Sequence, residues 1–142
     1  MTKYPISPPA SYVTPTAVGF ADAAGDLAIV GEAVPLPVAM RRDAAPAPLT
    51  GVASQPVVAG PFMPLRDAPV HIQLGGEWMG QVTLQRSTDG GTTRLGVTAG
   101  GMPWASFAGN ANEIVWQEAE QGASLYLDIA ITSGTVNYRL SQ

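Results

Sequence analysis

Residues 70–94 read VHIQLGGEWMGQVTLQRSTDGGTTR, and this stretch decides the fold class. Its apolar side chains occupy every second position, at Val70, Ile72 and Leu74 and again at Val82 and Leu84. A two-residue period is typical of a strand with one buried face, whereas a helix would repeat its apolar positions every three or four residues. The stretch therefore predicts two short strands, and His71 is expected on the outward face.

The same period recurs in short runs to the end of the chain, separated by Gly, Asn and Asp. The expected strands are residues 69–75, 80–87, 92–98, 103–107, 112–117, 123–132 and 135–141. Trp116, inside the apolar run IVWQ, is expected in the core. About ten residues per strand and no helical periodicity predict an all-β fold, a small antiparallel β-sandwich of immunoglobulin-like or jelly-roll-like type over residues 66–142.

Residues 1–65 have a different composition, because eleven of the thirteen prolines lie between Pro5 and Pro64. Proline removes a backbone donor and restricts the residue before it to extended conformations. We therefore expect an extended Pro/Ala-rich arm with one short strand at residues 27–30. Apolar residues recur along it, which is unusual for a disordered tail. A flexible linker remains an alternative, but the pattern favours an arm that lies along another surface.

The composition excludes several classes of partner. Only 13% of the residues are charged, against 46% hydrophobic, which suits a protein that covers much of its surface with neighbours, including copies of itself. A net charge of −4 with seven basic residues argues against nucleic acid. The absence of cysteine excludes disulfides, and no apolar run predicts a signal peptide or a membrane span.

The segment RSTDGGTTR, residues 86–94, resembles a binding loop but has the composition of a turn. Asp-Gly and Gly-Gly are strong hairpin signals because glycine tolerates a positive φ. Side chains such as Ser87 and Asp89 bond to nearby backbone amides and close such a loop locally. We predict a structural hairpin turn formed by Ser87, Asp89, Gly90, Gly91 and Thr93.

These turn residues also match the Asp-box pattern Ser-x-Asp-x-Gly-x-Thr of sialidases and other β-propellers. In those families the box is a hairpin remote from the catalytic centre. The box normally ends in an aromatic residue, where this chain has Arg94, and a propeller repeats the box once per blade, whereas this chain has one copy. The resemblance implies a hairpin and no sialidase activity.

A longer resemblance covers most of residues 66–142. The motifs are Trp-Gly-x-Val, an Arg-Ser-x-Asp-Gly-Gly hairpin, a Glu-rich turn, an apolar strand with Tyr, and a final Ser-Gly-Thr-x-x-Tyr-Arg hairpin. The residues that carry them are Trp78, Gly80, Val82, Arg86, Ser87, Asp89, Gly90, Gly91, Glu118, Glu120, Tyr126, Ser133, Gly134, Thr135, Tyr138 and Arg139. This order is similar to that of small β-domain virion proteins of tailed bacteriophages and prophages. The resemblance implies a virion protein whose partners are capsid or tail subunits.

Chemically reactive groups are few. His71 is the single histidine, and no serine lies in a nucleophile elbow. Glu113, Glu118 and Glu120 are the candidates for a catalytic carboxylate pair, but Glu118 and Glu120 flank the turn EAEQGA, where we expect their charge to solvate a loop. Arg139 is a candidate ion-pair partner of Glu118, Glu120 or Asp128. No run of acids alternates as calcium ligands do. We therefore expect no enzyme activity, no cofactor and no metal.

Trp78 and Trp104 are the candidate ligand-binding or interface aromatics, because exposed tryptophan faces bind sugars in many β-sandwich modules. Packing against the domain edge or a neighbouring subunit is the favoured interpretation of both.

The sequence thus predicts an accessory structural protein of a tailed-phage virion, attached by its N-terminal arm, with head decoration favoured. The alternative is a tail, fibre or baseplate component whose β-module binds a carbohydrate or receptor, with a host glycan as partner in a fibre.

Overall fold

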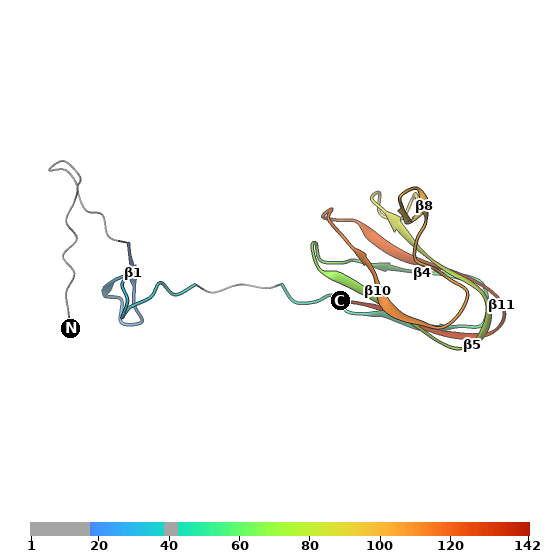
Figure 1. Ribbon diagram of the computed structural model, residues 1–142, viewed down its shortest axis with the longest axis horizontal. Coiled ribbons are helices and arrows are strands. Elements are labelled where there is room, and N and C mark those ends of the chain that lie inside the picture. Colours follow the sequence, from blue (N-terminus) through green and yellow to red (C-terminus); the bar gives the residue numbers. More distant parts are fainter. Residues whose placement is uncertain (1–17, 39–42) are drawn as a thin grey trace. The chain divides into compact units, whose positions relative to one another are not determined.

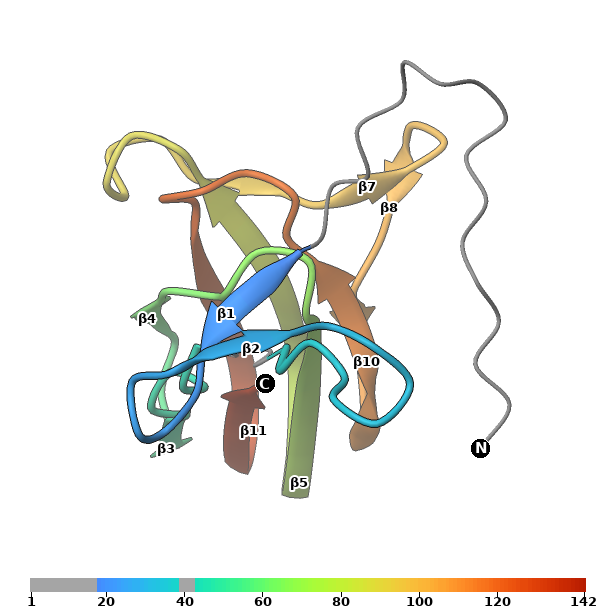
Figure 2. The same cartoon turned by 90° about the vertical axis from the view of Figure 1, so that its left-hand side faces the viewer.

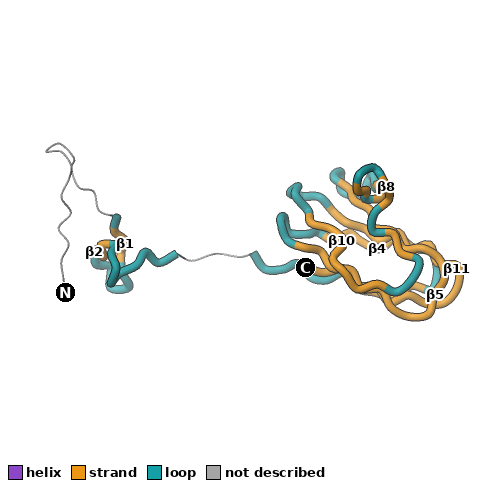
Figure 3. The backbone as a smooth tube through the Cα atoms, in the orientation of Figure 1, coloured by secondary structure: helices purple, strands orange, loops and turns teal. Residues whose placement is uncertain are grey.

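The computed structural model describes residues 18–38 and 43–142, so the expectations for residues 1–17 and 39–42 lie outside the described residues. The chain divides into two compact units, residues 1–42 and residues 43–142. We call residues 18–38 the N-terminal hairpin and residues 43–142 the β-unit. Strands and loops make up both, with no helix among the described residues (Figures 1 and 3).

The N-terminal hairpin pairs β1 (Gly19–Ala21) with β2 (Leu27–Ile29) in antiparallel register. Asp22 closes its turn, because its Oδ1 accepts hydrogen bonds from the amides of Ala24 and Asp26 at 2.9 and 3.0 Å. The expected strand at residues 27–30 is thus present. It belongs to a hairpin and is not an isolated extended segment.

The β-unit is an antiparallel β-sandwich built from one seven-stranded sheet that folds over itself. Its two long strands, β5 (Pro69–Ser87) and β11 (Ser124–Ser141), pair along almost their whole length and run side by side through the bend (Figures 1 and 2). The remaining strands of the sheet are β3 (Leu49–Ala53), β4 (Val57–Phe62), β6 (Leu95–Gly96), β9 (Ser106–Phe107) and β10 (Ala111–Gln117). β7 (Thr98–Ala99) and β8 (Met102–Pro103) pair with each other in a separate two-stranded antiparallel sheet.

Each half of the long pair has its own neighbours. The first half of β5 pairs with β10, and the last part of β11 pairs with β3. The second half of β5 pairs with β6 and β9, and the first part of β11 pairs with β4. The two layers of the sandwich are therefore continuous through β5 and β11, as the folded ribbon in Figure 1 shows.

Glycines allow the bend between the layers. Gly134 has φ +83°, and a Cβ there would collide with the Glu77 carbonyl oxygen of the paired strand. A register shift lies beside it, between Ile131 and Ser133. Such a bulge adds one residue to a strand and increases its bend. It also moves the inward positions of β11 from odd numbers, such as Ile129, to even numbers, such as Val136, so both layers face one core.

The core consists of alternate residues from both layers, as the two-residue period predicts. Its fully buried members include Val70, Ile72, Val82, Leu84, Leu125, Leu127, Ile129, Val136 and Leu140. Burying one such side chain contributes about 1.5–3 kcal/mol relative to leaving it in water. His71 is exposed as expected, and Trp116 is half-buried against the core.

The all-β antiparallel fold is confirmed, but the boundary at residue 65 is wrong. β3 and β4 lie within the expected arm, yet they pair with β11, and Phe62 is 2% exposed in the core. The prediction took Pro56 and Pro61 as evidence against strands. Both lie in or beside edge strands, where one side of the backbone faces no neighbouring strand, so the missing N–H breaks no hydrogen bond of the sheet. The side chain of Gln142 ties the C-terminus to the same region, donating to the carbonyls of Leu65 and Ala68.

Candidate functional site

The five predicted turn residues lie together at the connection from β5 to β6, with Ser87 as the last residue of β5 and the other four in the loop that follows. The Ser87 hydroxyl donates to Asp89 Oδ1 at 2.7 Å and accepts from the Gly91 amide at 2.9 Å. The Thr93 amide donates to both carboxylate oxygens of Asp89, at 2.8 and 3.0 Å. The loop therefore closes on its own side chains, with positive φ at Gly90 and Gly91.

These bonds stabilise the charged form of Asp89. The Thr93 amide and then the Ser87 hydroxyl lower the pKa of this carboxyl from 3.8 to about 2. Both carboxylate oxygens of Asp89 already accept hydrogen bonds from Ser87 or Thr93, so the role of this side chain in the structure is to hold the turn.

Arg94 takes the place of the aromatic residue that normally ends an Asp box. Its guanidinium carbon lies 5.4 Å from the ring centroid of Tyr126 on β11, a cation–π arrangement. Gly91 also approaches this ring so closely that a Cβ would collide with the Tyr126 hydroxyl. The loop is thus docked on the sandwich through Tyr126.

Arg86 and Glu118 form a bidentate ion pair in the β-unit, and the expectation for Glu118 is wrong. Glu118 is 1% exposed and does not solvate a loop. Arg86 Nε donates to Oε2 and Nη2 to Oε1, each at 2.8 Å, and Nη2 also contacts Glu120 at 2.7 Å. The Trp116 indole N–H donates to Oε2 at 3.1 Å.

The Arg86 hydrogen bond dominates the electrostatics of Glu118. It lowers the pKa of the carboxyl to about 2, assisted by the Glu120 amide and the Trp116 indole and opposed by burial. The pKa of Arg86 is raised in return. A carboxylate bonded to this extent stabilises the protein and is a poor proton donor or acceptor. Arg139, the partner expected from the sequence, is exposed and forms no ion pair with it.

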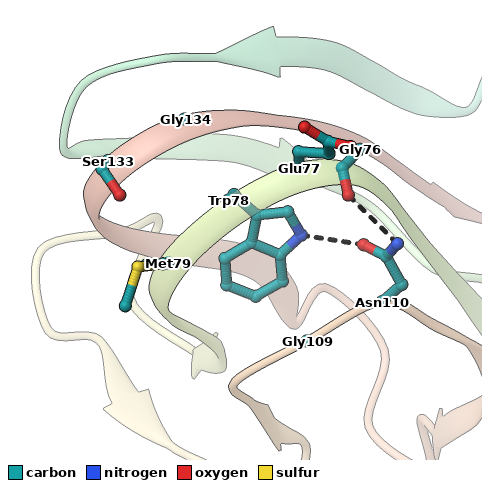
Figure 4. A pocket seen from close by; sticks show the side chains of 8 residues that line it. All are labelled: Gly76, Glu77, Trp78, Met79, Gly109, Asn110, Ser133 and Gly134. Atoms are coloured by element: carbon teal, nitrogen blue, oxygen red, sulfur yellow. Dashed lines mark hydrogen bonds between the residues drawn. The ribbon is translucent and has the colours of Figure 1, made fainter.

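Trp78 lies in a hollow of about 510 Å³ at the bend of the sheet (Figure 4). Its indole N–H donates to Asn110 Oδ1 at 2.9 Å, and Asn110 Nδ2 donates to the Gly76 carbonyl at 3.1 Å. Glu77 and Ser133 also line the hollow. The sequence prediction named only Trp78, because β10 pairing brings in Asn110 from 32 positions away and no local pattern marks it.

Trp104 lies elsewhere, in the segment that follows β8, and does not line this hollow. Its indole N–H donates to the Val115 carbonyl of β10 at 2.9 Å, and 50% of the residue is exposed. This bond holds the ring against β10 at Val115, where the register of the β5–β10 pairing shifts.

The remaining candidate groups are not assembled into one site. His71 and Glu113 are exposed, and Glu118 is occupied by Arg86. In residues 18–38 and 43–142 no three acidic or histidine side chains are placed to hold a metal ion. The described part of the chain has no helix long and apolar enough to cross a membrane.

No protein-family model matches the sequence, and comparison with curated proteins and with solved structures gave no match either.

Proposed function

We propose that this protein is an accessory structural component of a tailed-phage virion, held on the particle by its N-terminal arm. The proposal starts from the resemblance of the strand and turn motifs of residues 66–142 to small phage virion proteins. Its attachment mechanism depends on a single structural observation, which is that the N-terminal hairpin exposes its large apolar side chains.

The exposure of the N-terminal hairpin is large for so short a segment. No residue of 18–38 is buried. Six large apolar side chains are exposed by 40–77%: Val18, Leu27, Ile29, Val34, Leu36 and Val38. The cross-strand partners of Leu27 and Ile29 are Ala21 and Gly19, which are too small to shield them. A two-stranded hairpin is marginal in water by itself, so a partner surface is needed to stabilise this one.

The charge of the hairpin indicates the chemistry of its partner. Residues 18–38 contain Asp22, Asp26 and Glu32 and no basic residue. The docking surface should therefore be an apolar groove with neutral or basic margins. The β-unit is itself acidic, with eight acidic residues against four arginines, and two of those arginines, Arg66 and Arg86, are paired with acids. A different virion subunit fits better than a second copy of this chain.

The energetics favour attachment in several copies. Burying six partly exposed aliphatic side chains contributes on the order of 5–10 kcal/mol. Association of two bodies costs about 4–15 kcal/mol before contacts are counted. One hairpin alone thus binds weakly, and a symmetric homo-oligomer that engages several arms at once raises the affinity without new contacts. Prolines in the arm reduce the entropy lost on docking, because the free chain is already restricted.

Head decoration is the favoured position, since capsid lattices offer repeated grooves to many arms. A tail, fibre or baseplate position is the second candidate, and the Trp78 hollow is the observation that favours it.

Cosedimentation with particles of the phage whose genome encodes the chain tests the attachment. The full chain should pellet with particles that lack it, and the double variant Leu27→Asp, Ile29→Asp should stay in the supernatant. The double variant Ala23→Asp, Ala24→Asp adds the same charge in the exposed hairpin turn and should pellet like the wild type. Equal pelleting of all three chains would contradict arm-mediated attachment.

A further inference from the structure

The edge strands of the seven-stranded sheet differ in how they are protected from other chains. β3 and β4 border β11, β10 borders β5, and each of the three has one edge without a neighbouring strand among the described residues (Figure 2). Natural edge strands carry charges, prolines or bulges that prevent pairing with another chain. β10 has the exposed Glu113, β4 has Pro61, and the pairings of both strands show a register shift.

β3 has none of these protective features. Its sequence, LTGVA, contains no charged residue and no proline, and its five residues pair with β11 in an unbroken register. On its other edge, no described residue forms a backbone hydrogen bond with it. A regular, uncharged strand with a free edge is a template for the addition of a further strand.

The outer face of β3 favours a second copy of this chain as the source of that strand. Thr50 and Val52 point outward, and Val52 is 65% exposed. Neither β3 nor its partner residues on β11 include an acid that would repel a second acidic chain. If two β3 strands run antiparallel with Gly51 opposite Gly51, Thr50 of each chain lies opposite Val52 of the other. β-Branched side chains pack well against such neighbours, so this register covers Val52.

Tyr138 supports the same two-fold arrangement. Its ring extends from β11 over Gly51, where its hydroxyl takes the place that a Cβ of Gly51 would occupy. The ring packs partly against the core, but the hydroxyl has no hydrogen-bond partner within the described residues. Cβ positions of directly opposed residues lie about 4.5–5.5 Å apart in an antiparallel pair. The two Tyr138 hydroxyls would therefore face each other across the glycine pair, within reach of one bridging water.

We infer that two copies of this chain form a symmetric dimer by antiparallel pairing of their β3 strands, centred on Gly51. One layer of each sandwich then continues into the other, and the free edge of β3 gains backbone hydrogen bonds. Only five residues of each chain pair, so the dimer is weak, with a dissociation constant on the order of 10–100 µM. The dimer rests on the proposed function only for its role, as part of the homo-oligomer proposed above, because the interface lies wholly in the β-unit.

Sedimentation of the full chain tests the dimer, at concentrations from about 10 to about 500 µM. The wild type should change from monomer to dimer over this range. Val52→Lys should stay monomeric, because each lysine would lie beside Thr50 of the other chain, whose partner on β11 is Arg139. Ile114→Lys is the matched control on β10, since Ile114 is also an exposed aliphatic residue of an edge strand, and it should dimerise like the wild type.

Two further variants separate this dimer from association through the arm. The double variant Leu27→Asp, Ile29→Asp should dimerise like the wild type, because the N-terminal hairpin lies outside the interface. Tyr138→Phe keeps the ring over Gly51 and removes only the hydroxyl, so it should weaken the dimer roughly fivefold.

Disulfide formation locates the register, because the chain has no cysteine of its own. An equimolar mixture of Thr50→Cys and Val52→Cys chains, oxidised with copper phenanthroline, should give a mixed disulfide-linked dimer, since directly opposed Cα atoms lie within reach of a disulfide. Either chain alone should crosslink much less, because its two cysteines would be diagonal neighbours about 7–8 Å apart.

Four results would overturn the β3 dimer: a monomer at every concentration, dimerisation unaffected by Val52→Lys, dimerisation abolished by Leu27→Asp, Ile29→Asp, or equal crosslinking of single and mixed chains. Failure of the proposed function has a different readout, which is equal pelleting of the wild type and both hairpin variants with particles.

Discussion

The guanidinium of Arg86 and the carboxylate of Glu118 meet in two parallel hydrogen bonds of 2.8 Å each, and their side chains are 25% and 2% exposed. Arg86 stands near the end of β5, and Glu118 follows β10. The pair therefore joins the start of the Asp89 loop to the turn before β11. A paired charge of this kind stabilises the structure only while both partners are present.

Arg86→Ala should lower the free energy of unfolding by about 3 kcal/mol, because it leaves Glu118 buried without its cation. Urea unfolding measures the effect. Arg66→Ala is the matched control, since the Arg66–Asp67 pair is 60% and 66% exposed and should change stability by less than about 1 kcal/mol. Equal effects of the two variants would show that Glu118 does not depend on its partner.

Stability should fall as the pH drops from about 5 to about 2. The pKa of Glu118 in the folded chain is about 2, below its ordinary 4.5, so its contribution is complete above pH 5 and is lost towards the folded pKa. The loss is about 3 kcal/mol at most. The lowered pKa of Asp89 acts in the same direction. Glu118→Gln should be much less stable than wild type at pH 7 and nearly equal to it at pH 2; a gap that does not change with pH would contradict this origin.

Gly134→Ala should destabilise the bend of β11 by more than about 2 kcal/mol. Its positive φ costs about 1 kcal/mol for a residue with a side chain, and the added Cβ collides with the Glu77 carbonyl. Gly75→Ala, at the same bend, has open space and should stay within about 1 kcal/mol of wild type. Thermal melts of both variants distinguish local strain from a general intolerance of the bend to substitution.

Asp89→Ala should open the loop between β5 and β6 without unfolding the sandwich. The Thr93 amide loses its acceptor and should exchange with solvent about an order of magnitude faster, as hydrogen exchange followed by NMR will measure. The amide of Val82, within β5, should keep its protection. Unchanged exchange at Thr93 would mean that the carboxylate does not hold the loop.

The sequence predicted the inward positions of the strands well, because the alternation at Val70, Ile72, Val82 and Leu84 is itself the burial pattern. It did not predict that residues 69–75 and 80–87 form one continuous strand. Glycines that end a strand and glycines that bend one look alike in a sequence. The membership of β3 and β4 in the sheet was missed for a related reason, since Pro61 breaks a central strand but is tolerated at an edge.

A candidate site could be predicted from the sequence only where its residues lie close together along the chain. The Asp89 loop depends on contacts within a few residues, so its sequence indicates the turn. The Glu118 pair and the Trp78 hollow join positions about thirty residues apart, and strand pairing alone creates them. One signal was available for Glu118: it follows Trp116 by two positions and so shares its side of the chain.

Cryo-electron microscopy of the particle encoded by the same genome is the most direct test of attachment through the arm. The β-unit should appear in symmetric copies on the outside of the particle, with residues 18–38 of each copy lying in an apolar groove of a different subunit. Location on the capsid or on the tail would decide between the two positions. Absence of the chain from the particle, or a hairpin packed only against its own β-unit, would contradict the proposed function.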